Sequence, residues 1–210
     1  MIFFSCSLDG KILEKIFFKS YNSGSYSITL DLKRYSKVIS LVERLENSEN
    51  NFSEAVYNFF SNTAEKIKTI KGIKNTTLTY NEKLSSFILF FEFENIKALN
   101  AAISCVGEYL TTKEIISFKR GNHLRRILPN FANVISFLNK DNKSAEEKFG
   151  LKFFLKNFKV VFEYDFEKMK VRNPTSGFLK VSKNFQKVVY EDFLIDMTNE
   201  NSMHNIFLKT

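Results

Sequence analysis

Residues 87–93 have the sequence FILFFEF, and this stretch indicates the fold of the chain more clearly than its neighbours do. Successive side chains of a strand point to opposite faces, and both faces of this stretch are apolar apart from Glu92. A strand that is apolar on both faces is typical of the centre of a covered sheet. Residues 76–80 predict a partner strand, because only Asn81-Glu82-Lys83 and a few further residues separate the two, a connection of hairpin length.

The segments before this hairpin predict one strand and two helices. Residues 26–32 alternate with period two, which indicates a half-buried strand. Apolar side chains then fall at i, i+3, i+4 and i+7 over residues 38–45, which places them on one helix face. Ser53 is a candidate N-cap for a second helix, which ends near Gly72.

The segments after the hairpin predict another helix and another strand. Asn95 is a candidate N-cap, and the apolar stripe over residues 96–110 has 3-4-3-4 spacing. Residues 114–118 have strand character. From residue 26 to residue 118 the order is therefore β-α-α-β-β-α-β, which predicts an α+β protein with a ferredoxin-like split β-α-β unit.

Further strands are expected on both sides of this unit. Residues 12–18 and 123–128 are apolar enough, and residues 158–166 alternate most cleanly in the chain. Shorter strands are expected at residues 178–181, 188–190 and 206–208. We therefore expect a truncated signal and lipid-anchor segment at 1–10, a ferredoxin-like domain at 11–139 and a β-rich C-terminal extension at 140–210.

The chain is basic, with a net charge of +8 and a pI near 9.3. Basic proteins bind nucleic acid or anionic lipid because phosphates attract Lys and Arg. Here 31 basic residues are interspersed with 23 acidic ones, without a run of five like charges, which favours a solvated basic surface. The sequence has no stretch of 18 apolar residues that would predict a transmembrane helix.

The N-terminus, Ile2-Phe3-Phe4-Ser5-Cys6, resembles the end of a bacterial lipoprotein signal peptide. In such signals the Cys carries the acyl chains and a small residue precedes it, as Ser5 does here. A full signal has a basic region and a longer apolar stretch, so this reading expects further codons upstream. The alternative is that residues 2–4 begin a buried strand and that Cys6 is a core thiol.

Three segments together resemble a group of uncharacterised lipoproteins of the Bacteroidetes. They are Cys6 with Gly24-Ser25-Tyr26, residues 72–75 before the hairpin, and residues 158–171. The resemblance implies a cell-envelope location and no known chemistry. Surface-displayed members often carry acidic residues soon after the lipidated Cys. Only Asp9 does so here, so the resemblance implies a periplasmic-facing domain.

One patch of the sequence is densely basic. It comprises Lys119, Arg120, His123, Arg125 and Arg126. If residues 123–128 form a strand, Arg125 and Arg126 point to opposite faces. The patch is either a solvated hairpin tip or a contact for anionic lipid headgroups or lipopolysaccharide phosphates.

The sequence offers little for catalysis. Cys105 and His123 could form a nucleophile and base, but Cys105 adjoins an apolar helix stripe, and buried free Cys is common and inert. His123 and His204, the only two His, have no carboxylate cluster beside them, so we expect no metal, no cofactor and no enzymatic activity.

The sequence therefore predicts a lipid-anchored envelope protein that acts as a binding or assembly module, with the membrane and an envelope protein as partners. The alternative is a cytosolic nucleic-acid-binding protein with a ferredoxin-like sheet. RNA-recognition modules stack bases on aromatic side chains of such a sheet. Residues 86–93 lack the basic-Gly-aromatic opening of those modules, so nucleic acid is the less favoured partner.

Overall fold

The computed structural model describes residues 10–32, 52–81, 86–106, 115–119, 123–127, 156–171, 179–194, 196 and 205–209. Within them the chain is α+β, as predicted. The elements are β1 (Gly10–Phe18), β2 (Gly24–Asp31), α2 (Phe52–Lys68), β3 (Ile73–Asn81), β4 (Ser86–Phe93), α3 (Ile96–Val106), β5 (Ile116–Lys119), β6 (His123–Ile127), β7 (Phe158–Phe166), β8 (Leu179–Val181), β9 (Lys187–Phe193) and β10 (Asn205–Lys209).

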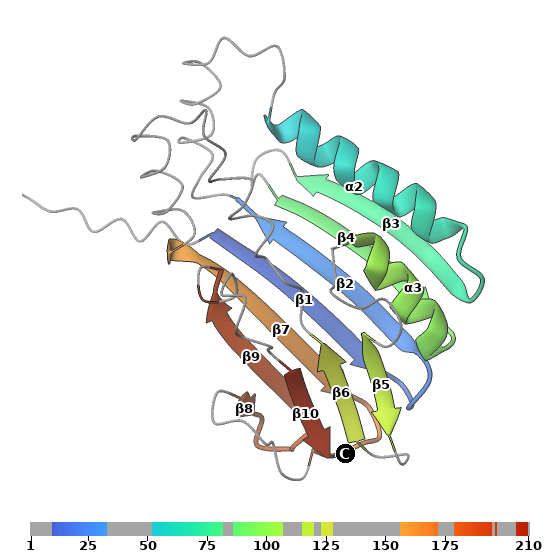
Figure 1. Ribbon diagram of the computed structural model, residues 1–210, viewed down its shortest axis with the longest axis vertical. Coiled ribbons are helices and arrows are strands. Elements are labelled where there is room, and N and C mark those ends of the chain that lie inside the picture. The colour runs from blue at the N-terminus through green and yellow to red at the C-terminus, as the bar shows by residue number, and fades with distance from the viewer. Residues whose placement is uncertain are drawn as a thin grey trace, which may run out of the picture.

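The strands form two sheets (Figure 1). The larger has seven strands in the order β3-β4-β2-β1-β7-β9-β8, and the smaller has three in the order β10-β6-β5. In the larger sheet β1 and β7 are parallel and every other neighbouring pair is antiparallel. The sheet is therefore mixed. β7 lies in the C-terminal part of the chain, yet it pairs directly with β1, the first strand that the structure describes.

The order β3-β4-β2 is the one that a split β-α-β unit requires, with β4 between two parallel strands. A ferredoxin-like unit would place the strand predicted at residues 114–118 on the other side of β2. This part of the prediction is wrong, because β1 occupies that position and β5 belongs to the smaller sheet. β1 reaches β2 through a short turn and pairs with it over eight residues, whereas β5 has only four residues.

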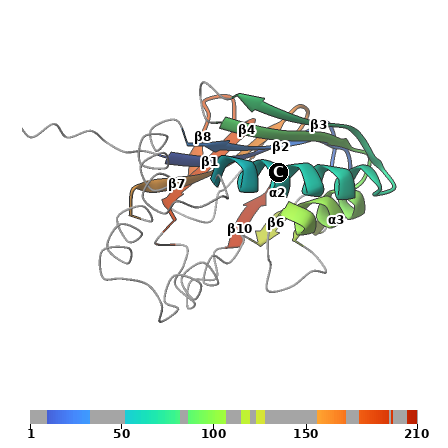
Figure 2. The same cartoon turned by 90° about the horizontal axis from the view of Figure 1, so that it is seen from above.

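The two helices and the smaller sheet lie on one side of the larger sheet (Figure 2). The even-numbered residues of β1 and β2 and the odd-numbered residues of β4 face this side and form the core. The core of β4 is almost fully buried, with Phe87, Leu89, Phe91 and Phe93 exposed by 2% or less. The sequence predicted that both faces of β4 are covered, but Ile88 on the other face is 38% exposed.

That other face, hereafter the open face, carries pairs of opposite charges. Lys15 on β1 contacts Glu163 and Asp165 of β7, both at 2.8 Å, and Lys187 of β9 contacts Glu163 at 2.7 Å. Burial alone would raise the pKa of Glu163, but the two ammonium groups more than offset it and hold that pKa below its usual value. The ion pairs thus join three neighbouring strands across the open face.

The helix ends confirm the predicted start of α3 and the predicted stop after α2, but not the predicted N-cap Ser53, which lies inside α2 because this helix begins at Phe52. Asn95 Oδ1 accepts a hydrogen bond from the Ala98 backbone N–H at 2.8 Å, which is the N-cap of α3. Gly72 has φ of 92°, a conformation that favours glycine, and it follows the end of α2. The predicted helix at 38–45 and the predicted boundary between 139 and 140 lie outside the described residues. No helix in the described part of the chain is long and apolar enough to cross a membrane.

Candidate binding cleft

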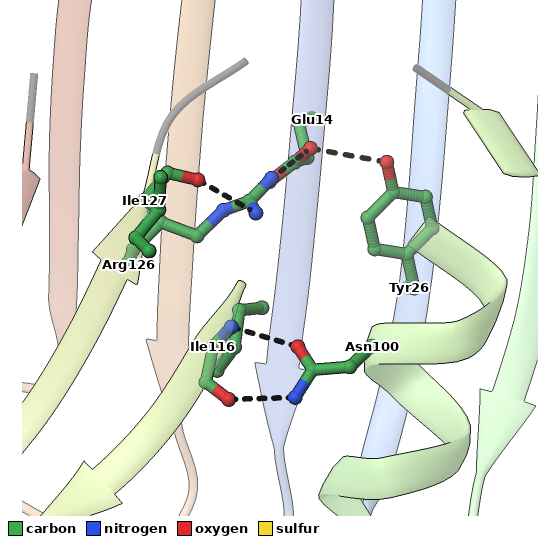
Figure 3. A network of polar contacts seen from close by, with 6 residues as sticks. All are labelled: Glu14, Tyr26, Asn100, Ile116, Arg126 and Ile127. Carbon is green, nitrogen blue, oxygen red and sulfur yellow. Dashed lines mark hydrogen bonds and ion pairs between the residues drawn. The ribbon is translucent and has the colours of Figure 1, made fainter. Parts of the chain in front are cut away.

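Asn100 attaches the smaller sheet to α3 (Figure 3). Its Oδ1 accepts a hydrogen bond from the Ile116 N–H at 2.7 Å, and its Nδ2 donates one to the Ile116 carbonyl at 2.8 Å. The amide of Asn100 therefore replaces the strand partner that the first residue of β5 lacks on this side. Because Ile116 is fully buried, these two bonds satisfy backbone groups that water does not reach.

A buried ion pair attaches the smaller sheet to the larger one at a second point (Figure 3). Arg126 of β6 donates from Nη2 to both carboxylate oxygens of Glu14 on β1, at 2.8 Å each. Its Nη1 donates to the Ile127 carbonyl at 3.1 Å, and the Tyr26 hydroxyl donates to Glu14 at 3.1 Å. The Arg126 side chain is fully buried and that of Glu14 is 4% exposed, so each charge offsets part of the cost of burying the other.

The two attachments leave a cleft of about 750 Å³ where α3, β5 and the β1–β2 turn meet. The turn and β5 contribute an aromatic wall, in which the rings of Tyr21 and Phe118 pack edge to face at 5.3 Å. The full lining comprises Tyr21, Asn22, Ile96, Lys97, Asn100, Ala101, Ser104, Ile116, Ser117 and Phe118. A volume of this size is within the range of small-molecule sites.

Some polar groups of the cleft have hydrogen-bond partners within the protein and others do not. Asn22 Oδ1 accepts a hydrogen bond from the Ile96 N–H at the start of α3, and the amide of Asn100 is occupied by β5. Ser117 Oγ is buried and has no hydrogen-bond partner among the described residues. Lys97 projects from an exposed position of α3. The cleft thus combines an aromatic wall, a buried hydroxyl and one cation.

The structure separates the members of the predicted basic patch. His123 is exposed at the start of β6, and Arg125 is half-buried on the same face of that strand. Arg126 points to the other face, as predicted, and there it is buried in the ion pair with Glu14. The prediction that Arg126 contacts lipid headgroups is therefore wrong. Lys119 is the last residue of β5 and pairs with His123, and Arg120 lies outside the described residues. Headgroup contact by the other four residues stays a prediction.

Lys119 and His123 of the patch lie near the end of the sheet where β1 finishes. Phe118, next to Lys119 in the chain, packs edge to face on Phe18, the last residue of β1, at 5.3 Å. The first residue of β1, Gly10, is the described residue nearest to Cys6 along the chain. A nine-residue strand spans roughly 26 Å, so Lys119 and His123 lie towards the end of the sheet opposite to the start of β1.

The other sequence-predicted groups are placed as follows. Cys105 is half-buried on α3 and its thiol donates to the Ala101 carbonyl at 3.4 Å, while His123 belongs to the smaller sheet. Cys6 and His204 lie outside the described residues. Among the described residues, no three His, Cys, Asp or Glu side chains are grouped as metal ligands.

The aromatic face of β4 is unsuited to stacking bases. Its four apolar side chains lie under the helices, where nucleic acid has no access. The open face exposes Ile88, but lysines from β1, β7 and β9 there are paired with carboxylates, such as Lys159 with Glu191 at 2.9 Å. Paired lysines leave little net positive charge for phosphates.

Sequence reasoning missed Glu14, although the pattern contains a signal for it. Ile12, Ile16 and Phe18 set the inward face of β1, and this register places Glu14 inward too. A buried carboxylate requires a partner, so the pattern indicates a buried cation elsewhere. Arg126 could not be chosen from the sequence, because its partner is 112 residues away.

Comparisons with known proteins give a structural likeness and no sequence match. No family model matches the chain, and no curated protein matches it. The chain is similar in structure to the folded domain of the Mycobacterium tuberculosis LppM protein, determined by NMR. The TM-score is 0.44 at 8% sequence identity, and the match covers 96% of this chain and 88% of that one.

Proposed function

We propose that the protein is a non-catalytic binding module of the bacterial cell envelope, tethered by a lipid on Cys6. Its ligand is a small anionic molecule that occupies the cleft between α3, β5 and the β1–β2 turn. The observation that carries this proposal is the cleft itself, which has a volume of about 750 Å³ and joins an aromatic wall to the cation of Lys97.

Charge and shape support an anionic ligand that contains a ring. Tyr21 and Phe118 offer ring surfaces, and Lys97 provides a positive charge at the rim. His123 and Lys119 follow Phe118 in the β5–β6 hairpin, so the predicted basic patch flanks the cleft. Small-molecule sites commonly combine apolar walls with a few polar groups that fix orientation.

The position of β1 supports a tether that leaves the cleft accessible. Three residues separate Cys6 from Gly10, and the four steps from one Cα to the other span at most about 14 Å. An acylated Cys6 would therefore hold the start of β1 close to the bilayer. Tyr21 and Asn22 follow the other end of β1, so in this arrangement the cleft opens on the membrane-distal side of the protein. Lys119 and His123 beside the cleft then serve the ligand and not the lipid headgroups of the tethering bilayer.

The tether is tested by mass spectrometry of the protein purified from its own cells. The proposal expects an acylated peptide that begins at Cys6, and recovery of the protein in the membrane fraction. Cys6→Ser should release the protein from that fraction, whereas the matched variant Cys105→Ser should not. An intact Met1 with an unmodified Cys6 thiol would contradict the tether.

The cleft is tested with 8-anilinonaphthalene-1-sulfonate, an anionic aromatic dye whose fluorescence rises in apolar sites. We expect Lys97→Glu to weaken dye binding about five- to tenfold, because an attractive charge at the rim becomes repulsive. Lys68→Glu makes the same change of net charge at an exposed position of α2 and should leave binding within about twofold. Equal weakening by both variants would contradict binding in the cleft.

A further inference from the structure

The outer side of β3 is an open edge of the larger sheet. β3 is the terminal strand in the sheet order, paired on one side with β4. Within the described ranges no strand pairs with its other side. An edge strand presents a row of backbone N–H and C=O groups that can pair with a further strand.

Only the first part of β3 carries features that protect an edge. Lys74 is charged and forms an ion pair with Glu94, and the register with β4 shifts between Lys74 and Thr77. Asn75 within this irregular stretch has φ of 52°. Charges and bulges of this kind discourage edge-to-edge pairing.

The second part of β3 lacks such protection. The five residues 77–81 pair regularly with β4 and have the sequence TLTYN, without charge, proline or glycine. Thr and Tyr are among the residues that favour strands. Residues 77–80 are therefore a regular, uncharged stretch of edge that another strand can extend.

This edge is complementary to itself. In an antiparallel pairing of two copies centred on Thr79, Leu78 lies opposite the partner's Tyr80, and Thr79 lies opposite the partner's Thr79. Leu78 and Tyr80 share the helix-covered face, because their neighbours on β4 are the core residues Leu89 and Phe87. Aliphatic–aromatic and Thr–Thr pairs of this kind stabilise antiparallel strands, and the pairing brings no like charges together.

Exposed aromatic rings continue the edge on its helix side. Tyr80 is 37% exposed and stacks on Phe87 with ring centroids 4.5 Å apart. Tyr57 of α2 is 44% exposed, and its ring centroid lies 6.2 Å from that of Tyr80. A Leu78 side chain from a second copy would pack against this aromatic surface and remove it from water.

We propose that the protein forms a two-fold symmetric dimer in which β3 pairs antiparallel with β3 of a second copy, centred on Thr79. The two larger sheets then form one continuous sheet. A closed two-fold contact of this type uses the same surface on both subunits and limits the assembly to two. The dimer is independent of the proposed ligand cleft.

Sedimentation equilibrium over a range of concentrations tests the dimer. Wild-type protein should shift from 24.5 kDa towards twice that mass as the concentration rises. Thr79→Lys places two like charges opposite each other on the axis and should weaken dimerisation at least tenfold. A wild-type protein that stays monomeric at all concentrations overturns the proposal.

Ile88→Lys is the matched control. Ile88 is the β4 neighbour of Thr79 on the same open face, but it lies one strand inward from the edge. Edge pairing leaves it outside the contact, so Ile88→Lys should dimerise as the wild type does. If Ile88→Lys abolishes the dimer and Thr79→Lys does not, the subunits associate through their open faces and the proposal is wrong.

Disulfide trapping tests the register without depending on dimer strength. In a background with Cys6→Ser and Cys105→Ala, Thr79→Cys should oxidise to a covalent dimer, because paired Cα atoms lie about 4.5–5.5 Å apart. Ile88→Cys should not, because three strand spacings place its two copies about 14 Å apart. Faster cross-linking through Thr77→Cys or Ile88→Cys overturns the register.

Discussion

Nη2 of Arg126 lies 2.8 Å from each carboxylate oxygen of Glu14, and neither side chain is appreciably exposed. The two residues connect β6 of the smaller sheet to β1 of the larger one. A charge left without its partner in such a site costs about 3–5 kcal/mol. We therefore expect Glu14→Gln to reduce the free energy of unfolding by about that amount, measured by urea denaturation at neutral pH.

Coupling between the two residues is tested with Glu14→Leu, Arg126→Met and the double variant, all made with Tyr26→Phe so that no hydroxyl loses its acceptor. Because replacing a buried ion pair by apolar residues is often neutral, the double variant should be more stable than either single variant. Losses that simply add would show that the two side chains do not act as a pair.

Asn100, like Arg126, should hold the smaller sheet in position. Asn100→Ala leaves the buried N–H and C=O of Ile116 without their partners, which costs about 2–3 kcal/mol. Hydrogen exchange should accelerate at the amides of β5 and β6 more than at those of β1 and β2. Ser104→Ala, which removes only an exposed bond to Ala101 on the same helix, should leave both patterns unchanged.

The free energy of unfolding should fall at acidic pH as Glu163 on the open face becomes protonated. Its pKa is lower in the folded protein than its usual value, so its stabilising contribution is complete above the unfolded pKa of about 4.3. The contribution is lost as the pH falls through the lower, folded pKa. The pKa of Lys15 is raised, chiefly by its hydrogen bond to Asp165, so Lys15 stays charged throughout this range.

Glu163→Gln should therefore be less stable than the wild type at pH 7, and the difference should shrink as the pH falls below the unfolded pKa and through the lower, folded pKa of Glu163. We expect a difference of about 1 kcal/mol at pH 7, because Lys15 and Lys187 are about two-fifths exposed and water screens them. Urea denaturation at a series of pH values measures it. Glu65→Gln, in an exposed pair on α2, should change the free energy of unfolding at pH 7 by less than about 0.5 kcal/mol.

Local patterns predicted most of the described strands but not their order. The alternation over residues 158–166 matches β7, and Gly72 and Asn95 mark helix ends as expected. The parallel pairing of β7 with β1 could not be predicted, because alternation shows which face is buried and not which strand is adjacent. This pairing joins β7, β9 and β8 to the larger sheet, whereas β10 belongs to the smaller one.

The candidate site was harder to predict than the fold. A run of basic residues indicated a surface patch, yet Arg126 is internal because Glu14 faces the core from a distant part of the sequence. The cleft depends on three segments, represented by Tyr21, Lys97 and Phe118, that meet only in the folded chain. Nothing in the local pattern of any one of them indicates the other two.

Position 24 in the first hairpin should accept no residue larger than glycine without a loss of stability. A Cβ atom there would lie 1.8 Å from the carbonyl oxygen of Phe17 and 3.0 Å from the ring of Phe93. Phe18 on β1 and Phe93 on β4 are the strand neighbours of Gly24, and their rings pack with centroids 6.1 Å apart. Because the closer atom belongs to the backbone, no change of rotamer relieves the contact.

Gly24→Ala should thus lower the free energy of unfolding by about 3 kcal/mol or more, at the upper end of overpacking effects. Ser25→Ala, one residue on and facing the open side, should change it by less than about 0.5 kcal/mol. Thermal and urea unfolding of both variants measure the comparison. Equal stability of the two would contradict the close approach of β1 and β2 at this turn, since a hairpin with more room would accept the methyl group.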